Sequence, residues 1–186
     1  GMSSSAKEVR LILAALHRQI IRQNSIESSL RGTSCKVQLS PQGLGSAMLG
    51  LQLMSSGVKE VKQILALVTD SIRHCPKPLD PQAVANILIG LKTMSSADRE
   101  VRLLLGALVN SLSLRGGKGE MMPIMRRASS REISMALWGM QGLSTEYQEV
   151  RDILAVLTDA VLYNTGRESG DKDVHPSTVK YISVLQ

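Results

Sequence analysis

A segment of this chain recurs along the sequence, and the recurrence limits what the chain can fold into. Residues 50–56 read GLQLMSS, residues 90–96 read GLKTMSS, and residues 139–145 read GMQGLST. An apolar stretch opening on a Glu-Val pair follows each copy, and the same pair stands near the amino terminus as Glu8 and Val9. A period of roughly 40 to 50 residues is typical of stacked supersecondary units, because one unit cannot bury its own apolar face. We therefore expect a stack of similar units.

Each full repeat opens with residues that favour the start of a helix. Ser40 and Asp80 each precede a proline, and Ser129 and Ser130 precede Arg131. Ser and Asp side chains accept hydrogen bonds from the first free N–H groups of a helix, and proline has no N–H to leave unpaired. We call the helix that is predicted after each of these starts helix A. Apolar residues recur along it at i, i+3, i+4 and i+7: Leu44, Ala47, Met48 and Leu51; Val84, Ile87, Leu88 and Leu91; Ile133, Ala136, Leu137 and Met140.

A pair of hydroxyl residues separates helix A from a second predicted helix, which we name helix B. The pairs occupy residues 55–56, 95–96 and 144–145. Helix B carries its own apolar face: Val61, Ile64, Leu65 and Val68; Val101, Leu104, Leu105 and Leu108; Val150, Ile153, Leu154 and Leu157. Each repeat is therefore predicted to be a pair of helices.

The predicted fold is all-α, an α-solenoid-like stack of antiparallel helix pairs within a single domain over residues 1–186. Three full repeats cover residues 39–72, 79–112 and 128–161, joined by connectors at residues 73–79 and 113–127. A half-repeat at residues 1–20 is a lone helix B, followed by a polar connector at residues 21–38, and a partial repeat at residues 173–186 opens like another helix A. By analogy with known solenoids, we expect a right-handed stack.

Glycine recurs inside helix A as Gly50, Gly90 and Gly139. Glycine in a helix costs about 1 kcal/mol relative to alanine, so its recurrence needs a reason. Close packing of neighbouring helices is the favoured explanation, and contact with a ligand is the alternative.

Positive charge is concentrated in the first two-thirds of the chain. The formal net charge is +6, and residues 1–127 hold 17 Lys and Arg against 8 Asp and Glu. Such an excess favours polyanionic partners, nucleic acid first, although solubility alone also explains it. The chain has no Phe and one Trp, so a site that stacks successive bases on aromatic rings is not expected.

The strongest candidate for a binding site is a set of cations near the start of helix B. We name Lys7, Lys59 and Arg99 the first cation column, whose place Gln148 takes in the last repeat. We name Arg10, Lys62, Arg102 and Arg151 the second cation column. Residues at i and i+3 share a helix face, so stacking would align all seven into a basic ladder able to follow a phosphate backbone. The alternative is a solvated flank beside Glu residues that favour the helix N-terminus.

Helix A offers a second surface that recurs in each repeat. Its polar positions are Gln42, Ser46 and Gln52; Gln82, Asn86 and Lys92; Arg131, Ser134 and Gln141. Modular RNA readers address one base per repeat with such side chains, but a solvated helix face has the same composition.

The sequence favours neither catalysis nor a cofactor. His17, His74 and His175 stand in unrelated contexts, and no nucleophile or metal-binding motif is present. No apolar run reaches the roughly 18 residues of a membrane span. Two cysteines are too few for a disulfide framework, so we expect an intracellular protein of the cytoplasm or an organelle rather than a secreted one.

Short motifs in helix A resemble those of the octotricopeptide and heptatricopeptide repeat family. They are Leu39–Ser40–Pro41–Gln42 with Leu44 and Leu49–Gly50–Leu51, and Leu79–Asp80–Pro81–Gln82 with Ile89–Gly90–Leu91. Ala136–Leu137–Trp138–Gly139–Met140 is similar to the Ala-Leu-Trp-Ala-Leu element of the same family. The resemblance implies an α-solenoid that binds RNA.

The sequence thus predicts a non-enzymatic helical-repeat module that binds RNA or another nucleic acid through the basic ladder. A protein-interaction scaffold is the alternative, favoured by few aromatic residues and by methionines expected to be exposed at Met121, Met122 and Met125. A third hypothesis is self-association into a homo-oligomer through the open ends of the stack.

Overall fold

The described residues fold into helices joined by turns and short connectors. The structure, a computed structural model, describes residues 7–31, 39–75, 77–113 and 123–168, and this part of the chain contains no strand. The helices are α1 (Lys7–Arg31), α2 (Pro41–Gly50), α3 (Lys59–Arg73), α4 (Pro81–Gly90), α5 (Arg99–Ser113), the 3-10 helix η1 (Ile124–Arg127), α6 (Ser130–Met140) and α7 (Gln148–Glu168). The all-α prediction is confirmed.

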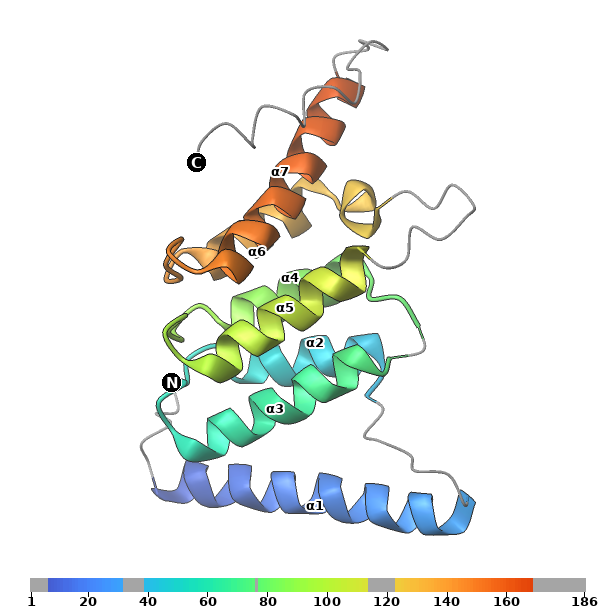
Figure 1. Ribbon diagram of the computed structural model, residues 1–186, viewed down its shortest axis with the longest axis vertical. Helices are drawn as coiled ribbons and strands as arrows, with labels where there is room; N and C mark the ends of the chain where they lie inside the picture. Colours follow the sequence, from blue (N-terminus) through green and yellow to red (C-terminus); the bar gives the residue numbers. More distant parts are fainter. Residues whose placement is uncertain (1–6, 32–38, 76, 114–122, 169–186) are drawn as a thin grey trace.

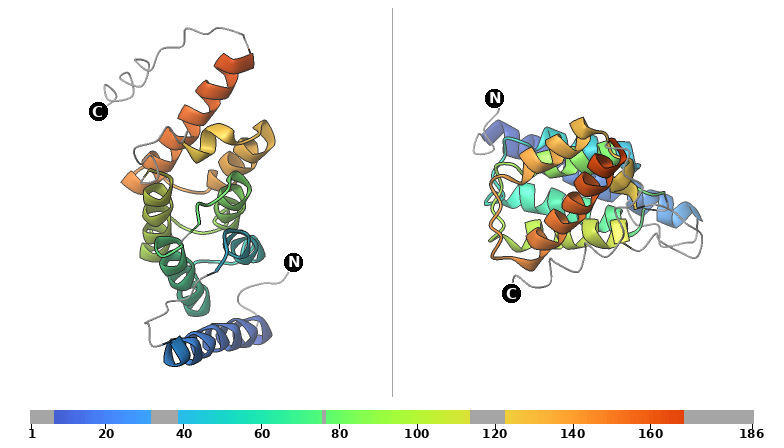
Figure 2. Two further views of the ribbon diagram at one scale, coloured as in Figure 1. Left: turned by 90° about the vertical axis from the view of Figure 1, so that its right-hand side faces the viewer. Right: turned by 90° about the horizontal axis from the view of Figure 1, so that it is seen from above.

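The helices lie in two rows (Figure 1). One row holds the A helices, with α4 lying between α2 and α6. The other row holds the B helices in the order α1, α3, α5 and α7, each in contact with the next. Figure 2 shows the two rows side by side, with α1 and α7 at opposite ends.

The predicted starts of helix A are confirmed. The Ser40 side-chain oxygen accepts a hydrogen bond from the Gly43 N–H at 3.1 Å, and Asp80 Oδ1 accepts one from the Ala83 N–H at 2.7 Å. Ser129 forms a reciprocal capping box with Glu132. Each cap satisfies a backbone donor that has no partner inside its helix, which fixes the first residue of helix A.

The apolar faces of both rows form one continuous core. Among the fully buried side chains are Leu44, Met48, Leu65, Leu88, Leu104 and Leu105. Leu137 departs from the predicted apolar face, since it is largely exposed. Leu137 corresponds in α6 to Leu88 in α4. Helix α6 packs on α4 at Leu88, but no described helix packs on α6 at Leu137.

The glycine column marks close approaches between A helices, as predicted, at two of its three positions. A Cβ atom at Gly90 would overlap the Met48 backbone of α2, and one at Gly139 would overlap the Leu88 backbone of α4. At Gly50 a Cβ atom would meet no heavy atom within 4 Å, so the close approach predicted there is absent from the described residues.

Two predicted boundaries need correction. Helix α1 continues to Arg31 and so takes up much of the predicted connector 21–38, because the first helix-breaking residue after its start is Gly32. Helix α7 likewise continues to Glu168, past the predicted repeat end at residue 161.

The connector at residues 113–127 contains η1, whose Met125 is buried rather than exposed as expected. Arg126 of η1 donates two hydrogen bonds to Asp159 of α7, at 2.7 and 2.8 Å, and holds this segment against the core. Met121, Met122 and the predicted partial repeat at residues 173–186 lie outside the described residues.

Candidate nucleic-acid interface

The three turns that join helix A to helix B share one construction. The first hydroxyl residue of each pair closes the turn, because its side-chain oxygen accepts a hydrogen bond from the backbone N–H two residues later. These bonds join Ser55 to Gly57, Ser95 to Ala97 and Ser144 to Glu146, at 3.2, 3.2 and 3.3 Å. Such local bonds compete with helix formation and so separate the two helices.

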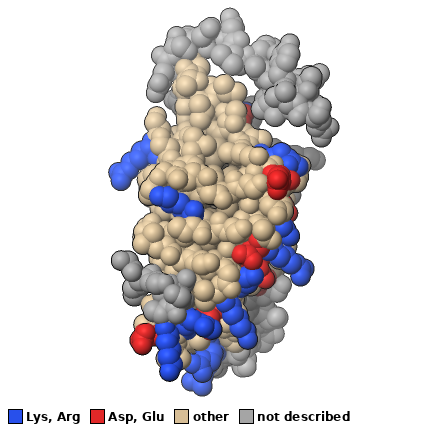
Figure 3. All heavy atoms as spheres, turned by 90° about the vertical axis from the view of Figure 1, so that its left-hand side faces the viewer, with Lys and Arg blue, Asp and Glu red and all other residues tan. Residues whose placement is uncertain are grey.

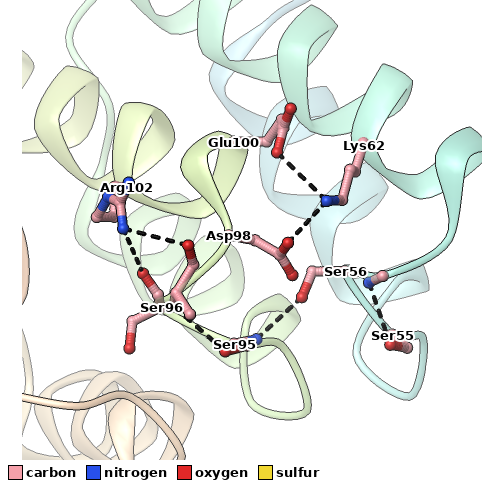
Figure 4. A network of polar contacts seen from close by, with 10 residues as sticks. Ser55, Ser56, Lys62, Ser95, Ser96, Asp98, Glu100 and Arg102 are labelled. Carbon is pink, nitrogen blue, oxygen red and sulfur yellow. Dashed lines mark hydrogen bonds and ion pairs between the residues drawn. The ribbon is translucent and has the colours of Figure 1, made fainter.

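The second serine of a pair ties its turn to the next turn (Figure 4). The Ser56 hydroxyl oxygen accepts a hydrogen bond from the Ser95 N–H at 2.9 Å, and the Ser96 hydroxyl oxygen accepts one from the Ser144 N–H at 2.9 Å. Both serine side chains are buried. Thr93 adds a link by donating to the carbonyl oxygens of Gln52 and Met54, each at 3.1 Å. The starts of the B helices are therefore held in register along one edge of the molecule.

The second cation column forms contacts within the protein. Arg10 of α1 donates two hydrogen bonds to the Glu60 carboxylate of α3, both at 3.1 Å. The Lys62 ammonium of α3 lies 2.7 Å from Asp98 Oδ1 and 3.8 Å from Glu100 Oε2, both in the next repeat. Arg10 thus links α1 to α3. Lys62 links α3 to α5 and to Asp98, the residue just before α5.

Arg102 and Arg151 instead bond to the backbone of the turn that precedes their own helix. Arg102 donates to the carbonyl oxygens of Ser96 and Ala97, and its guanidinium lies 4.8 Å from the centroid of the Tyr147 ring in the following repeat. Arg151 donates to the carbonyl oxygens of Thr145 and Glu146 at 2.6 and 2.9 Å. The donors of this column that a phosphate would need are therefore largely engaged.

The pKa values of the paired groups shift in the directions that such contacts require. Hydrogen bonding to Arg10 lowers the pKa of Glu60, and bonding to Lys62, then to Ser56, lowers the pKa of Asp98. The same bonds raise the pKa of Arg10 and of Lys62. Both members of each pair stay charged near neutral pH, and the cation is neutralised locally by its partner.

The first cation column is placed differently. Lys7, Lys59 and Arg99 are the first residues of α1, α3 and α5, and all three are exposed. Three residues correspond to about 300° of helix rotation, so the two columns lie about 60° apart on one helix face, and they differ because the first column stands at the first residue of each helix, nearly one turn before the second column. The structure thus divides the seven predicted site residues into three exposed cations at helix starts and four cations that bond within the protein, two of which, Arg10 and Arg151, are exposed as well.

The exposed cations lie where the backbone also contributes positive potential. Unpaired N–H groups give the start of a helix a partial positive charge, so cations there are slightly unfavourable for helix stability and add to an anion-attracting field. Figure 3 views the molecule from the side on which the B helices begin; positive side chains gather toward the α1 end, with acidic side chains beside several of them.

The second predicted surface, on helix A, contains a contact that sequence reasoning missed. The Lys92 ammonium lies 3.5 Å from the centroid of the Trp138 ring, and Trp138 remains half exposed. The other polar positions on this surface are exposed or half-buried. The signal available in the sequence was that Lys92 and Trp138 flank the glycine positions of adjacent repeats.

The described residues offer neither a metal site nor a membrane span beside these surfaces. In the described ranges, no group of three or more His, Cys, Asp and Glu side chains could hold a metal ion. In the same part of the chain, every helix is too short or too polar to cross a membrane. Comparison of the chain with protein-family models, with curated proteins and with solved structures found no match.

Proposed function

We propose that the chain is a non-enzymatic helical-repeat module, an α-solenoid-like stack of antiparallel helix pairs. Three features recur from repeat to repeat and support this interpretation: the capped start of helix A, the serine link between turns, and the glycine contact between A helices. When successive repeats make the same contacts, equivalent side chains in successive repeats lie at a regular spacing.

The proposed ligand is RNA or another nucleic acid, held by the first cation column. The observation that carries this proposal is the exposure of Lys7, Lys59 and Arg99 at the same place in successive B helices. Neighbouring packed helices lie about 8–10 Å apart, so the column offers a row of cations to an extended polyanion. Contacts of this kind give affinity without sequence preference and weaken as salt rises.

The test is binding of a fluorescent single-stranded RNA of random sequence, measured by anisotropy at about 50 and about 200 mM salt. We expect binding at the lower salt that falls steeply at the higher salt, and loss of binding in the charge reversal Lys7→Glu, Lys59→Glu, Arg99→Glu. The matched control reverses three exposed cations away from the column, Arg73→Glu, Lys77→Glu and Arg127→Glu, and changes net charge equally. An equal loss of RNA binding in both variants would show that binding depends on net charge alone, which would contradict the proposal.

A protein-interaction scaffold is the second candidate function. Exposed apolar side chains on α1, notably Ile12 and Leu16, favour it. A wild-type chain that binds no RNA at the lower salt would make this candidate the working hypothesis.

A further inference from the structure

Two arginines and two serines stand together at the start of α6. Residues 126–130 read RRASS, so Ser129 follows Arg126 by three residues and Arg127 by two. This pattern fits the substrate site of an arginine-directed protein kinase, because kinases select substrates by their charge pattern and a guanidinium forms paired hydrogen bonds with a carboxylate. Neither the cation columns nor the polar surface of helix A includes these residues.

Ser129 is open to such an enzyme. Ser129 and Arg127 are both exposed. Ala128 and Ser129 have extended backbone, with ψ angles of 138° and 158°, and they precede the first turn of α6. Ser130 is exposed as well, but it is the first residue of α6, and the residue two positions before it is Ala128 rather than an arginine. The charge pattern and the backbone therefore both favour Ser129 over Ser130.

The other arginine of the pattern is held by α7. Arg126 donates its two hydrogen bonds to the Asp159 carboxylate. Beside it, Met125 is buried, and Asn164 of α7 donates a hydrogen bond to the Ala128 carbonyl oxygen at 3.0 Å. Arg126 cannot pair with a carboxylate of a kinase while it is paired with Asp159. Recognition of both arginines therefore requires η1 to leave α7 by a local opening.

We propose that Ser129 is a phosphorylation site for an arginine-directed serine/threonine kinase, and that the pairing of Arg126 with Asp159 limits its modification. In the reaction, Ser129 Oγ attacks the γ-phosphorus of ATP. An O–P bond forms as the bond from that phosphorus to the β,γ-bridging oxygen breaks, ADP leaves, and the hydroxyl proton passes to the aspartate base of the kinase. The product has a phosphate in place of the hydroxyl that donates to Glu132 Oε2 at 2.8 Å, so like charges meet and the capping box opens.

This inference goes beyond the proposed function, and its test contains no nucleic acid. The full chain is incubated with Mg²⁺, ATP and the catalytic subunit of cAMP-dependent protein kinase, and mass spectrometry of its peptides locates the phosphate. We expect phosphate on Ser129, lost in Ser129→Ala and kept in the matched variant Ser130→Ala. Arg127→Gln should lower the initial rate about tenfold by removing a charged hydrogen-bond donor. Arg131→Gln, which removes an equally exposed arginine two residues after Ser129, should leave the rate unchanged.

A second pair of variants tests the role of Asp159. Asp159→Asn should raise the initial rate roughly threefold, because the rate follows the population of the open segment and a partly exposed ion pair stabilises the closed one modestly. Asp152→Asn is the matched control on the same helix, where Asp152 accepts a hydrogen bond from Gln148, and should leave the rate unchanged.

Three results would each overturn the proposal: no transfer of phosphate to the wild type, phosphate mainly on a residue other than Ser129, or an Asp159→Asn chain phosphorylated no faster than the wild type. Circular dichroism of each variant confirms that the helices remain folded.

Discussion

The Ser56 side-chain oxygen accepts a hydrogen bond from the backbone N–H of Ser95, 39 residues away in the next repeat, at 2.9 Å. Asp98 accepts a hydrogen bond from Lys62, which lowers the pKa of Asp98 most, and hydrogen bonding with the same Ser56 hydroxyl lowers it further. One buried side chain therefore connects two turns and the ion pair beside them. Ser96 repeats the backbone bond to Ser144, so the link recurs at the next step of the stack.

Removing this link should destabilise the fold more than removing the neighbouring hydroxyl. Ser56→Ala removes a buried hydroxyl and leaves the Ser95 N–H without its partner in a partly buried setting, and loss of a partner in a buried setting typically costs about 1–3 kcal/mol. Ser55→Ala is the matched control, since its side chain is exposed and water can replace the bond to Gly57. Urea unfolding of both variants measures the difference. An equal loss of unfolding free energy in the two variants would show that the link between turns adds nothing.

The glycine column should respond to alanine in opposite directions at Gly90 and Gly50. At Gly90 an added Cβ overlaps the Met48 backbone, so α4 must shift away from α2, and overpacking of this kind costs about 1–3 kcal/mol. At Gly50 the space is open, so alanine should stabilise α2 by up to about 1 kcal/mol through its higher helix propensity. Thermal unfolding of the two variants gives the signs. A stabilising Gly90→Ala would contradict the close approach of α2 and α4.

Acid should weaken the contacts between successive B helices. Because the pKa values of Glu60 and Asp98 are lower in the folded than in the unfolded state, their contribution is present above the unfolded pKa, near pH 4, and is lost as pH falls through the folded values. The denaturant midpoint should therefore fall between pH 6 and pH 3 by more in the wild type than in the double variant Glu60→Gln, Asp98→Asn. The same pH dependence in both proteins would assign the acid sensitivity to other carboxylates.

The sequence was sufficient to predict features that depend on neighbours within a repeat. Ser40 and Asp80 cap helices because capping involves residues three positions apart, and the apolar faces follow from helix periodicity alone. Repetition also made Gly90 and Gly139 interpretable, since a residue that costs helix stability at each step needs a packing reason.

Features that depend on the relative rotation of helices could not be predicted. Lys59 and Lys62 look equivalent in the sequence, yet only Lys62 turns toward Asp98, 36 residues away. Met125 stands in an apolar stretch too short for a periodicity argument, and its burial follows from the bonds between Arg126 and Asp159. The exposure of Ile12 and Leu16 required knowledge of which helix lies beside α1.

The most direct test of the division into two cation columns compares two triple variants of equal net charge. One is Lys7→Gln, Lys59→Gln, Arg99→Gln; the other is Arg10→Gln, Lys62→Gln, Arg102→Gln. RNA affinity against salt and the thermal midpoint are measured for both. The first variant should keep its thermal midpoint and lose affinity, with a salt slope smaller by roughly 2 for three lost contacts to single-stranded RNA. The second should unfold at a lower temperature and retain most of its affinity while folded. Loss of RNA affinity in the second variant with affinity retained in the first would contradict the account.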